Sequence, residues 1–295
     1  MKKVLVTGAT GFTGSRVVPL LIAEGFWVRC LVRASSDRRR IQEYPVDCIE
    51  GDLKDVNSLS VAMEDVDYLI NVASIGFGHA PNIVKAAVQT DIERAVFIST
   101  TAIFTTLNVS SKKVRVNAEQ VIKKSPLQYT ILRPTMIYGS TGDRNMSRLL
   151  RYLKKYPFLP IFGNGKCLQQ PVYVEDVAWA AVAVLNNKET IGKAYNIPGA
   201  DALTMNQVVD TISILLGTQT QRMHLPAKPF VSGLTLLEKC GFSLPLKSEQ
   251  ILRLNEDKTF PWDDAARDFG YNPFSFKEGV SREIRAMGLD GGSEC

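Results

Sequence analysis

Three glycines close to the N-terminus have the spacing with which a backbone can hold a diphosphate. Gly8, Gly11 and Gly14 follow the apolar run 3–7 and precede an apolar-periodic segment. In such a motif the first glycine allows a tight turn, the second leaves space for a pyrophosphate, and the third lets a helix pack closely on a strand. The N-terminus of that helix offers free amides and a positive dipole to the phosphates. The motif therefore predicts dinucleotide binding, which we favour over a glycine-rich turn without a ligand.

The end of the next apolar run, 27–32, predicts which dinucleotide binds. NAD-binding chains usually place an acidic residue there, whereas this chain has Arg33 followed by Ser36 and Arg38. A guanidinium binds phosphate oxygens in a fork, so these residues favour the 2′-phosphate of NADP(H), with NAD(H) as the alternative cofactor. The alternative interpretation of residues 38–40 is that they form the solvated start of a helix. We accept this alternative for Arg39 and Arg40.

Alternating strands and helices must position these groups. Short Val- and Ile-rich runs predict buried strands, and the helical patterns between them predict crossovers. The expected fold class is α/β, with a Rossmann-type doubly wound parallel sheet whose ligands bind at the carboxyl ends of the strands. The expected strands are 3–7, 27–32, 48–53, 66–73 and 95–99.

From about residue 140 the pattern changes to a smaller, mainly helical lobe. We expect a dinucleotide-binding domain of residues 1–140, to which 168–198 return, and a substrate lobe of 141–167 and 199–295. Apolar side chains of this lobe are expected to form its core, with an apolar substrate pocket as the alternative. These side chains are Phe230, Leu234, Leu236, Leu237, Phe242 and Leu244, and the expected helices here and in the returning segment are 145–155, 175–186, 205–216 and 231–241.

Composition and charge argue against several other classes of protein. The 295 residues carry a net charge of +5 without a basic block, which argues against nucleic-acid binding. Two distant histidines and five scattered cysteines argue against a metal site or a disulfide framework. No apolar run reaches the ~20 residues of a membrane span, and the N-terminus enters a strand without a signal peptide. We expect a cytoplasmic monomer or homodimer that acts on a small-molecule substrate, with no metal, membrane or nucleic-acid partner.

Several short motifs follow one another along the first two-thirds of the chain. They are TGATGFTG at 7–14, GDL at 51–53, NVAS at 71–74, STT at 99–101, LRPTMIYG at 132–139 and QPVYVEDVA at 170–178. With these motifs the chain resembles the short-chain dehydrogenase/reductase superfamily in its extended and atypical branch. The most similar group is the NAD-dependent epimerase/dehydratase group, often called nucleoside-diphosphate-sugar epimerases. The resemblance implies a fold and a dinucleotide, but it does not imply one reaction.

The resemblance also implies roles for individual residues. Pro134 has a structural alternative, a strand-ending turn, and Asp176 is expected to cap a helix or to serve at a hinge. The implied cofactor-binding residues are Thr10, Phe12 and Thr13 in the glycine motif, Asp52 and Leu53 beside the adenine, Val72, Ala73 and Ser74 near the middle of the cofactor, Ser99 and Thr100 at the fifth strand, and Pro134, Thr135 and Ile137 beside the nicotinamide.

The catalytic pattern of this superfamily is altered in the chain. Members normally use Tyr-x-x-x-Lys on a helix, where the lysine lowers the tyrosine pKa so that the phenol can exchange a proton. Alignment on Glu119 places Ser111 at the tyrosine position and Arg115 at the lysine position. A serine is far harder to ionise, whereas Arg115 keeps a positive charge that could hold a ribose hydroxyl. The candidate catalytic residues are Thr101, Ser111 and Arg115; the alternatives are a helix N-cap at Ser110 or Ser111 and sheet packing for the threonine.

Three functions are compatible with these residues. The first is an NADP(H)-dependent reductase of a small carbonyl or unsaturated substrate, because water or the substrate can replace the tyrosine as proton source when the cofactor supplies hydride. The second is a nucleotide-sugar epimerase or dehydratase, against which the serine at position 111 counts, because sugar oxidation needs a base. The third is a non-catalytic protein that senses NADP(H) or serves in assembly.

Overall fold

A computed structural model of the chain describes all residues except 108–109, 144, 240–247 and 291–295, with the backbone alone for Ser110, Leu236 and Lys239. The described residues divide into two compact units. The first unit contains 1–137, 174–198 and 261–273, and the second contains the described residues of 138–173, 199–260 and 274–295. Residues 261–273, which the sequence placed with the C-terminal lobe, thus cluster with the N-terminal residues.

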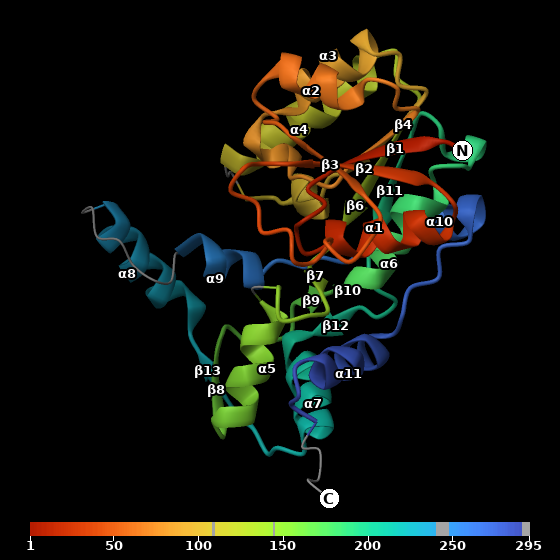
Figure 1. The fold of residues 1–295 in the computed structure, drawn as a ribbon. Helices are drawn as coiled ribbons and strands as arrows, with labels where there is room; N and C mark the ends of the chain where they lie inside the picture. The colour runs from red at the N-terminus through yellow and green to blue at the C-terminus, as the bar shows by residue number, and fades with distance from the viewer. Residues whose placement is uncertain (108–109, 144, 240–247, 291–295) are drawn as a thin grey trace, which may run out of the picture. The chain divides into compact units, whose positions relative to one another are not determined.

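A seven-stranded parallel sheet forms the centre of the first unit (Figure 1). Its strand order is β11-β6-β5-β4-β1-β2-β3, so the chain runs outward from β1 in both directions, which confirms the predicted doubly wound α/β fold. Ligands of such sheets bind where the strand order reverses, here between β1 and β4. The strands are β1 (Lys3–Thr7), β2 (Trp27–Val32), β3 (Asp47–Glu50), β4 (Tyr68–Asn71), β5 (Arg94–Ile98), β6 (Tyr129–Pro134) and β11 (Lys193–Ile197).

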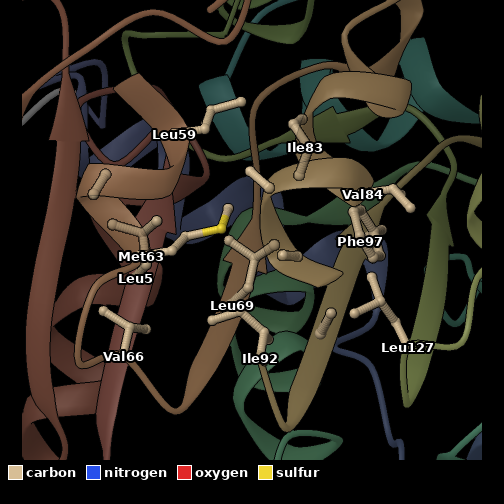
Figure 2. Close-up of a cluster of buried hydrophobic side chains, with 14 of the residues drawn as sticks. Leu5, Leu59, Met63, Val66, Leu69, Ile83, Val84, Ile92, Phe97 and Leu127 are labelled. Carbon is tan, nitrogen blue, oxygen red and sulfur yellow. The ribbon is translucent and has the colours of Figure 1, made fainter. Parts of the chain in front are cut away.

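Helices cover both faces of this sheet (Figure 1). The main core cluster lies between the sheet and the helices α2 to α4, and it includes the fully buried side chains of Leu5, Met63, Leu69 and Phe97 (Figure 2). The helices of the first unit are α1 (Gly14–Ala23), α2 (Val56–Met63), α3 (Ala80–Gln89), α4 (Ser110–Lys124), α6 (Val174–Ala183) and α10 (Asp263–Phe269), with the short 3-10 helices η1 (Ile75–Phe77), η2 (Thr101–Phe104) and η3 (Lys188–Thr190).

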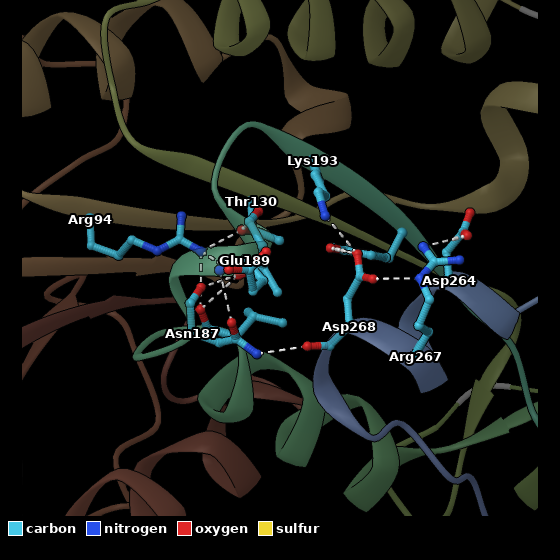
Figure 3. A network of polar contacts seen from close by, with 11 residues as sticks. Arg94, Thr130, Asn187, Glu189, Lys193, Asp264, Arg267 and Asp268 are labelled. Atoms are coloured by element: carbon cyan, nitrogen blue, oxygen red, sulfur yellow. Dashed lines mark hydrogen bonds and ion pairs between the residues drawn. The ribbon is translucent and has the colours of Figure 1, made fainter.

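Polar contacts hold α10 in the first unit (Figure 3). The Asp268 carboxylate accepts hydrogen bonds from Lys193 Nζ at 2.8 Å and from the Tyr195 hydroxyl at 2.7 Å, both on β11. Asn187 Nδ2 donates to the Asp268 carbonyl at 2.8 Å. These bonds pair segments about 75 residues apart in the chain, which a local sequence pattern does not reveal.

The second unit consists of short strand pairs and longer helices. Its core cluster combines buried side chains of α5, α7 and α11, among them Leu150, Ile212 and Val280. Against the prediction of a core position, Phe230 and Leu237 are 43% and 41% exposed, whereas Phe242 and Leu244 lie outside the described residues. The elements are α5 (Met146–Lys155), β8 (Phe158–Phe162), β9 (Leu168–Gln169), β10 (Val172–Tyr173), β12 (Leu203–Thr204), α7 (Met205–Leu216), β13 (Gln221–Leu225), α8 (Ala227–Lys239), α9 (Ser248–Leu254) and α11 (Phe276–Ala286), and β7 (Ile137–Tyr138) spans the boundary between the units.

Candidate functional site

The glycine motif forms a tight loop from β1 into α1. Gly8 has φ +72°, and a Cβ atom on it would lie 2.7 Å from the Ala73 backbone nitrogen. A Cβ on Gly14 would lie 2.1 Å from the Gly8 carbonyl oxygen, so only glycine permits this approach of helix to strand. Gly11 donates its N–H to the same carbonyl at 3.0 Å, which closes the turn. The loop therefore has the geometry that the glycine spacing predicts.

The beginning of α1 can receive an anion. Thr13 is the N-cap residue of α1, but its side chain accepts no capping hydrogen bond, and the first turn carries no acidic residue. Within the described part of the chain, the N–H groups of Phe12 and Thr13 donate no hydrogen bond. Free amides at a helix N-terminus, together with the positive end of the helix dipole, are suited to phosphate oxygens.

The loop after β2 holds the three residues expected near a 2′-phosphate. Arg33 is exposed, and among the described residues its guanidinium forms no ion pair. The Arg33 N–H donates to Ser36 Oγ at 3.0 Å, which fixes the turn. Arg38 is engaged with Glu50 of β3, because its Nη2 atom lies 2.6 Å from the Glu50 carboxylate. Residues 38–40 form no helix but part of a turn, so the predicted helix start is wrong.

The end of β3 presents one exposed and one packed residue. The Asp52 carboxylate is exposed and accepts the Lys54 N–H at 3.0 Å, while the Asp52 N–H donates to Ser58 Oγ at 2.9 Å. Leu53 packs partly against the main core, and its carbonyl accepts a hydrogen bond from Asn82. The Asp52 side chain is thus exposed at the edge of the sheet, whereas the Leu53 side chain is partly buried against the core.

Buried polar contacts fix the chain after β4. Thr7 Oγ1 at the end of β1 donates to Asn71 Oδ1 at 2.7 Å, and Asn71 Nδ2 donates to the Ala73 carbonyl at 2.9 Å. The Val72 N–H also donates to the Thr7 carbonyl at 3.1 Å. Residues 72–74 consequently lie directly beside the glycine loop, although more than 60 residues separate them from it.

A cavity of about 200 Å³ lies within the first unit. It brings together seven residues that the sequence singled out from five separate motifs. Two further lining residues, Ile75 and Ile98, were missed, although both adjoin predicted residues, Ser74 and Ser99. The cavity is lined by Thr13, Val72, Ser74, Ile75, Ile98, Ser99, Thr100, Arg115 and Ile137.

A buried carboxylate lies behind this cavity. Ser99 Oγ donates to Glu119 at 2.7 Å, and Arg133 binds the same carboxylate in a fork with distances of 2.9 and 2.6 Å. Burial opposes ionisation of Glu119, but the hydrogen bonds from Arg133 and Ser99 outweigh it and lower the carboxyl pKa. Glu119 therefore stays charged and holds the Ser99 hydroxyl proton. The sequence analysis used Glu119 only to align the helix and missed this role.

The two adjacent threonines at β5 point to different partners. Thr100 lines the cavity, and its hydroxyl oxygen accepts the Ala102 N–H at 3.2 Å. Thr101 is buried, and its hydroxyl donates to the Pro134 carbonyl at 3.4 Å. Of the two, Thr100 is the one that faces the cavity, and the observed contact of Thr101 corresponds to the sheet-packing alternative.

The helix α4 contributes Arg115 to the cavity, whereas Ser111 is not among the lining residues. A Cβ atom on Gly76 would lie 3.1 Å from Arg115 Nε, so the glycine leaves space for the guanidinium. Pro134 ends β6 and Thr135 follows it, and neither lines the cavity. The site thus offers hydroxyl groups and one guanidinium among aliphatic side chains.

A second cavity, of about 80 Å³, lies within the second unit. Its walls are mainly aliphatic side chains of α5 and β8, with Cys167 and Asn255 as polar members, and none of Phe230, Leu234 and Leu237 lines it. Among the described residues, no three His, Cys, Asp or Glu side chains are grouped as metal ligands. No helix in the described ranges is long and apolar enough to span a bilayer.

Residues 8–188 match the sequence profile of a family described as NAD(P)H-binding. The chain belongs to this NAD(P)H-binding family. The match covers the glycine loop, all residues that line the 200 Å³ cavity and the sheet strands β2 to β6. The expected NAD(P)-binding Rossmann domain of the epimerase/dehydratase type is confirmed.

The proteins that are similar to this chain have names that describe different roles. The chain is 27% identical to the mitochondrial NADH dehydrogenase [ubiquinone] 1 alpha subcomplex subunit 9 of Arabidopsis thaliana, over 89% of this chain and 70% of the relative. The crystal structure of gox2253 superimposes with a TM-score of 0.82 at 22% identity, over 99% of both chains. UDP-glucuronic acid 4-epimerase from Bacillus cereus, in complex with UDP-glucuronic acid and NAD, gives 0.75 at 20% identity, over 97% of this chain and 99% of that one. The two structures show a shared fold.

Proposed function

We propose that this NAD(P)H-binding protein is an NADP(H)-dependent reductase of a small carbonyl or unsaturated substrate. The observation that carries the proposal is the 200 Å³ cavity, whose lining combines Arg115 and Thr100 with other hydroxyl-bearing and aliphatic residues. A nicotinamide supplies hydride when it is bound. Both polar groups can donate hydrogen bonds to a substrate oxygen and stabilise the negative charge that develops there during reduction.

The remaining groups of the first unit are assigned to the nucleotide. The free amides of Phe12 and Thr13 bind the diphosphate, because an anion there satisfies donors that have no other acceptor in the described part of the chain. Arg33 binds the 2′-phosphate, and Asp52 lies beside the adenine end. Arg38 contributes less than the sequence suggested, because Glu50 already holds its guanidinium.

Serine at position 111 favours reduction over sugar epimerisation. Epimerisation begins with removal of a hydroxyl proton, for which a general base typically contributes ~10²–10⁴-fold. Arg115 stays protonated and cannot accept that proton. Reduction instead delivers a proton to the product oxygen, and water can provide it. The fold similarity to the UDP-glucuronic acid 4-epimerase nevertheless makes nucleotide sugars necessary substrates in any assay.

Nucleotide titrations test the cofactor assignment. We expect tighter binding of NADPH than of NADH, and Arg33→Ala should weaken NADPH binding by at least about tenfold, because a charge-assisted contact is worth ~1.5–3 kcal/mol. NADH binding should change little. Arg40→Ala is the matched control, since Arg40 is exposed in the same loop. Equal or tighter NADH binding by the native protein would refute NADP(H) preference.

Turnover assays test the reaction. NADPH oxidation is followed with a panel of small aldehydes, ketones and enones, and UDP- and dTDP-sugars are followed by chromatography. Robust epimerisation would overturn the reductase assignment. Tight NADPH binding without turnover in either assay favours a non-catalytic role, for which the 27% identity to a subunit of NADH dehydrogenase is the supporting observation.

A further inference from the structure

Two free cysteines occupy paired positions on neighbouring strands of the first unit. Cys30 on β2 is the register partner of Cys48 on β3. Register partners on parallel strands point to the same face of the sheet, and neighbouring strands lie about 4.8 Å apart. A disulfide joins Cα atoms that are about 4.4–6.8 Å apart. The backbone register thus places the two Cα atoms within the range that a disulfide can bridge.

The surroundings give the two thiols different reactivity. Cys30 is fully buried, and burial together with the nearby Cys48 raises its pKa to about 12. Cys48 is partly exposed; burial raises its pKa, but the neighbouring Arg38 guanidinium opposes the rise. Because Cys48 is reachable from solvent and Cys30 is not, Cys48 is the cysteine that meets a solvent-borne oxidant first. Cys30, protected from solvent, can then react only with its neighbour.

We propose that Cys30 and Cys48 form a reversible dithiol–disulfide pair that is oxidised by hydroperoxides. Cys48 Sγ attacks a peroxide oxygen, the O–O bond breaks, and water or an alcohol leaves, so that Cys48 becomes a sulfenic acid. Cys30 Sγ then attacks Cys48 Sγ, the S–O bond breaks, and hydroxide leaves as water with the proton of the Cys30 thiol. The two thiols lose two electrons and two protons to the peroxide, and an added dithiol restores both.

The position of the pair connects oxidation to the nucleotide site. Arg33 follows Cys30 by three residues at the end of β2, and Asp52 follows Cys48 by four residues after β3. Arg38, which lies near Cys48, also pairs with Glu50 on β3. A cross-link fixes the separation and orientation of β2 and β3 directly before the two loops, and we expect this restraint to shift the loop that carries Arg33. Weaker NADPH binding by the oxidised protein is the consequence, and this part of the inference rests on the proposed function.

A cysteine-restricted variant tests the chemistry without reference to the nucleotide. Cys167→Ser, Cys240→Ser and Cys295→Ser are combined, which leaves the pair as the sole cysteines. After treatment with hydrogen peroxide, the remaining thiols are alkylated under unfolding conditions and the protein is analysed by peptide mass spectrometry. We expect a linked 30–48 peptide that lacks two hydrogen atoms and disappears on reduction with dithiothreitol. Adding Cys48→Ser should leave Cys30 fully alkylated. Recovery of both thiols in alkylated form after oxidation, with the fold retained by circular dichroism, would overturn the proposal.

NADPH titration of the same samples tests the coupling. The reduced variant should bind NADPH like the native protein; failure of both to bind would contradict the proposed function and leave the disulfide result intact. Oxidation should weaken NADPH binding by about tenfold, the loss expected when a charge-assisted contact to the 2′-phosphate is removed. The Cys48→Ser version should show no change on oxidation. A linked pair with unchanged NADPH affinity would refute the coupling.

Discussion

Each of the two units buries an ionisable side chain, but the surroundings of the two side chains differ. In the first unit, Arg94 is 4% exposed, and its guanidinium donates to the carbonyls of Gln128 and Val184 and to two threonine hydroxyls (Figure 3). In the second unit, Glu283 is fully buried, it faces the carboxyl group of Asp143, and no ion pair of its own is found within the described residues. Burial and the neighbouring carboxylate of Asp143 raise the pKa of Glu283 to about 10.

This difference shows that burial alone does not determine the charge of a side chain. Burial lowers the pKa of Arg94 to about 10, so the guanidinium remains charged at neutral pH. Burial and Asp143 raise the carboxyl pKa of Glu283 well above neutral pH, so this group is protonated at the same pH. We therefore expect that removal of the Arg94 guanidinium destabilises the first unit and that removal of the Glu283 carboxyl group stabilises the second. The following predictions test that contrast, beginning with the largest effect.

Gly14→Val should be the most damaging change in the first unit. The new Cβ would lie 2.1 Å from the Gly8 carbonyl oxygen and 2.9 Å from Ala9 Cα. These are backbone atoms that cannot rotate away, so we expect a loss of more than about 3 kcal/mol in the free energy of unfolding. Urea denaturation followed by circular dichroism measures the loss.

Gly11→Val is the control for that experiment. Its Cβ meets only one atom within 4 Å, the Gly8 carbonyl oxygen at 3.1 Å, so the fold should persist. Nucleotide binding should nevertheless disappear, because the side chain occupies the space of the pyrophosphate. Micromolar NADPH binding by a normally folded Gly11→Val protein would show that the phosphate site is misplaced.

Arg94→Met should destabilise the first unit by about 3 kcal/mol, because it removes the four hydrogen bonds that the buried guanidinium donates. The control is Lys193→Met, which removes a half-exposed ion pair with Asp268 and should cost within about 1 kcal/mol. Denaturant midpoints compare the two variants. Equal losses of stability in the two variants would contradict the larger contribution that we expect from the buried Arg94 guanidinium.

Glu283→Gln should act in the opposite direction and stabilise the protein by about 2 kcal/mol at pH 7. The folded protein holds a proton on Glu283 that the unfolded chain releases above its ordinary pKa of 4.5. The free energy of unfolding of the native protein therefore falls as the pH rises from about 4.5 towards 10. The variant should lack this component of the pH dependence. A variant less stable than the native protein at pH 8 would refute the assignment.

The smallest effect is expected on the outer face of α8. Phe230→Ser should change the free energy of unfolding by about 1 kcal/mol, because the ring is 43% exposed and its ring contact is one edge-to-face pair with Phe162. Leu150→Ala on α5 is the contrast within the same unit; this side chain is fully buried in the core cluster, so we expect a loss of about 2–5 kcal/mol. Thermal denaturation distinguishes the two outcomes.

Local sequence was sufficient for the framework of the first unit. The short apolar runs and the glycine spacing predicted five of the seven strands, the doubly wound sheet and the loop from β1 into α1, whereas β6 and β11 were not predicted. These features depend on residues close together in the chain, whose backbone preferences and periodicity can be read directly. Five of the seven cavity residues were predictable for the same reason, since they follow the end of a strand or cap a helix, whereas Arg115 lies within α4 and Ile137 within β7.

Other features depended on contacts between distant segments. The sequence named Thr100 and Thr101 together, but side chains of adjacent residues point in different directions, and only the fold shows that Thr100 lines the cavity. The pairing of Arg38 with Glu50 requires β3 to lie beside β2, and the docking of α10 on β11 requires Asp268 to meet Lys193 and Tyr195.

The sequence by itself determined the fold class, the glycine loop and the family of this protein, because those properties follow from local sequence patterns. The tertiary structure alone decided which polar side chains face the cavity, which are bound by buried partners, and that Cys30 and Cys48 are register partners on adjacent strands. A one-residue shift in register would turn one thiol to the opposite face of the sheet. Register is set by the packing of the whole sheet, and for that reason no pattern around either cysteine could predict their pairing.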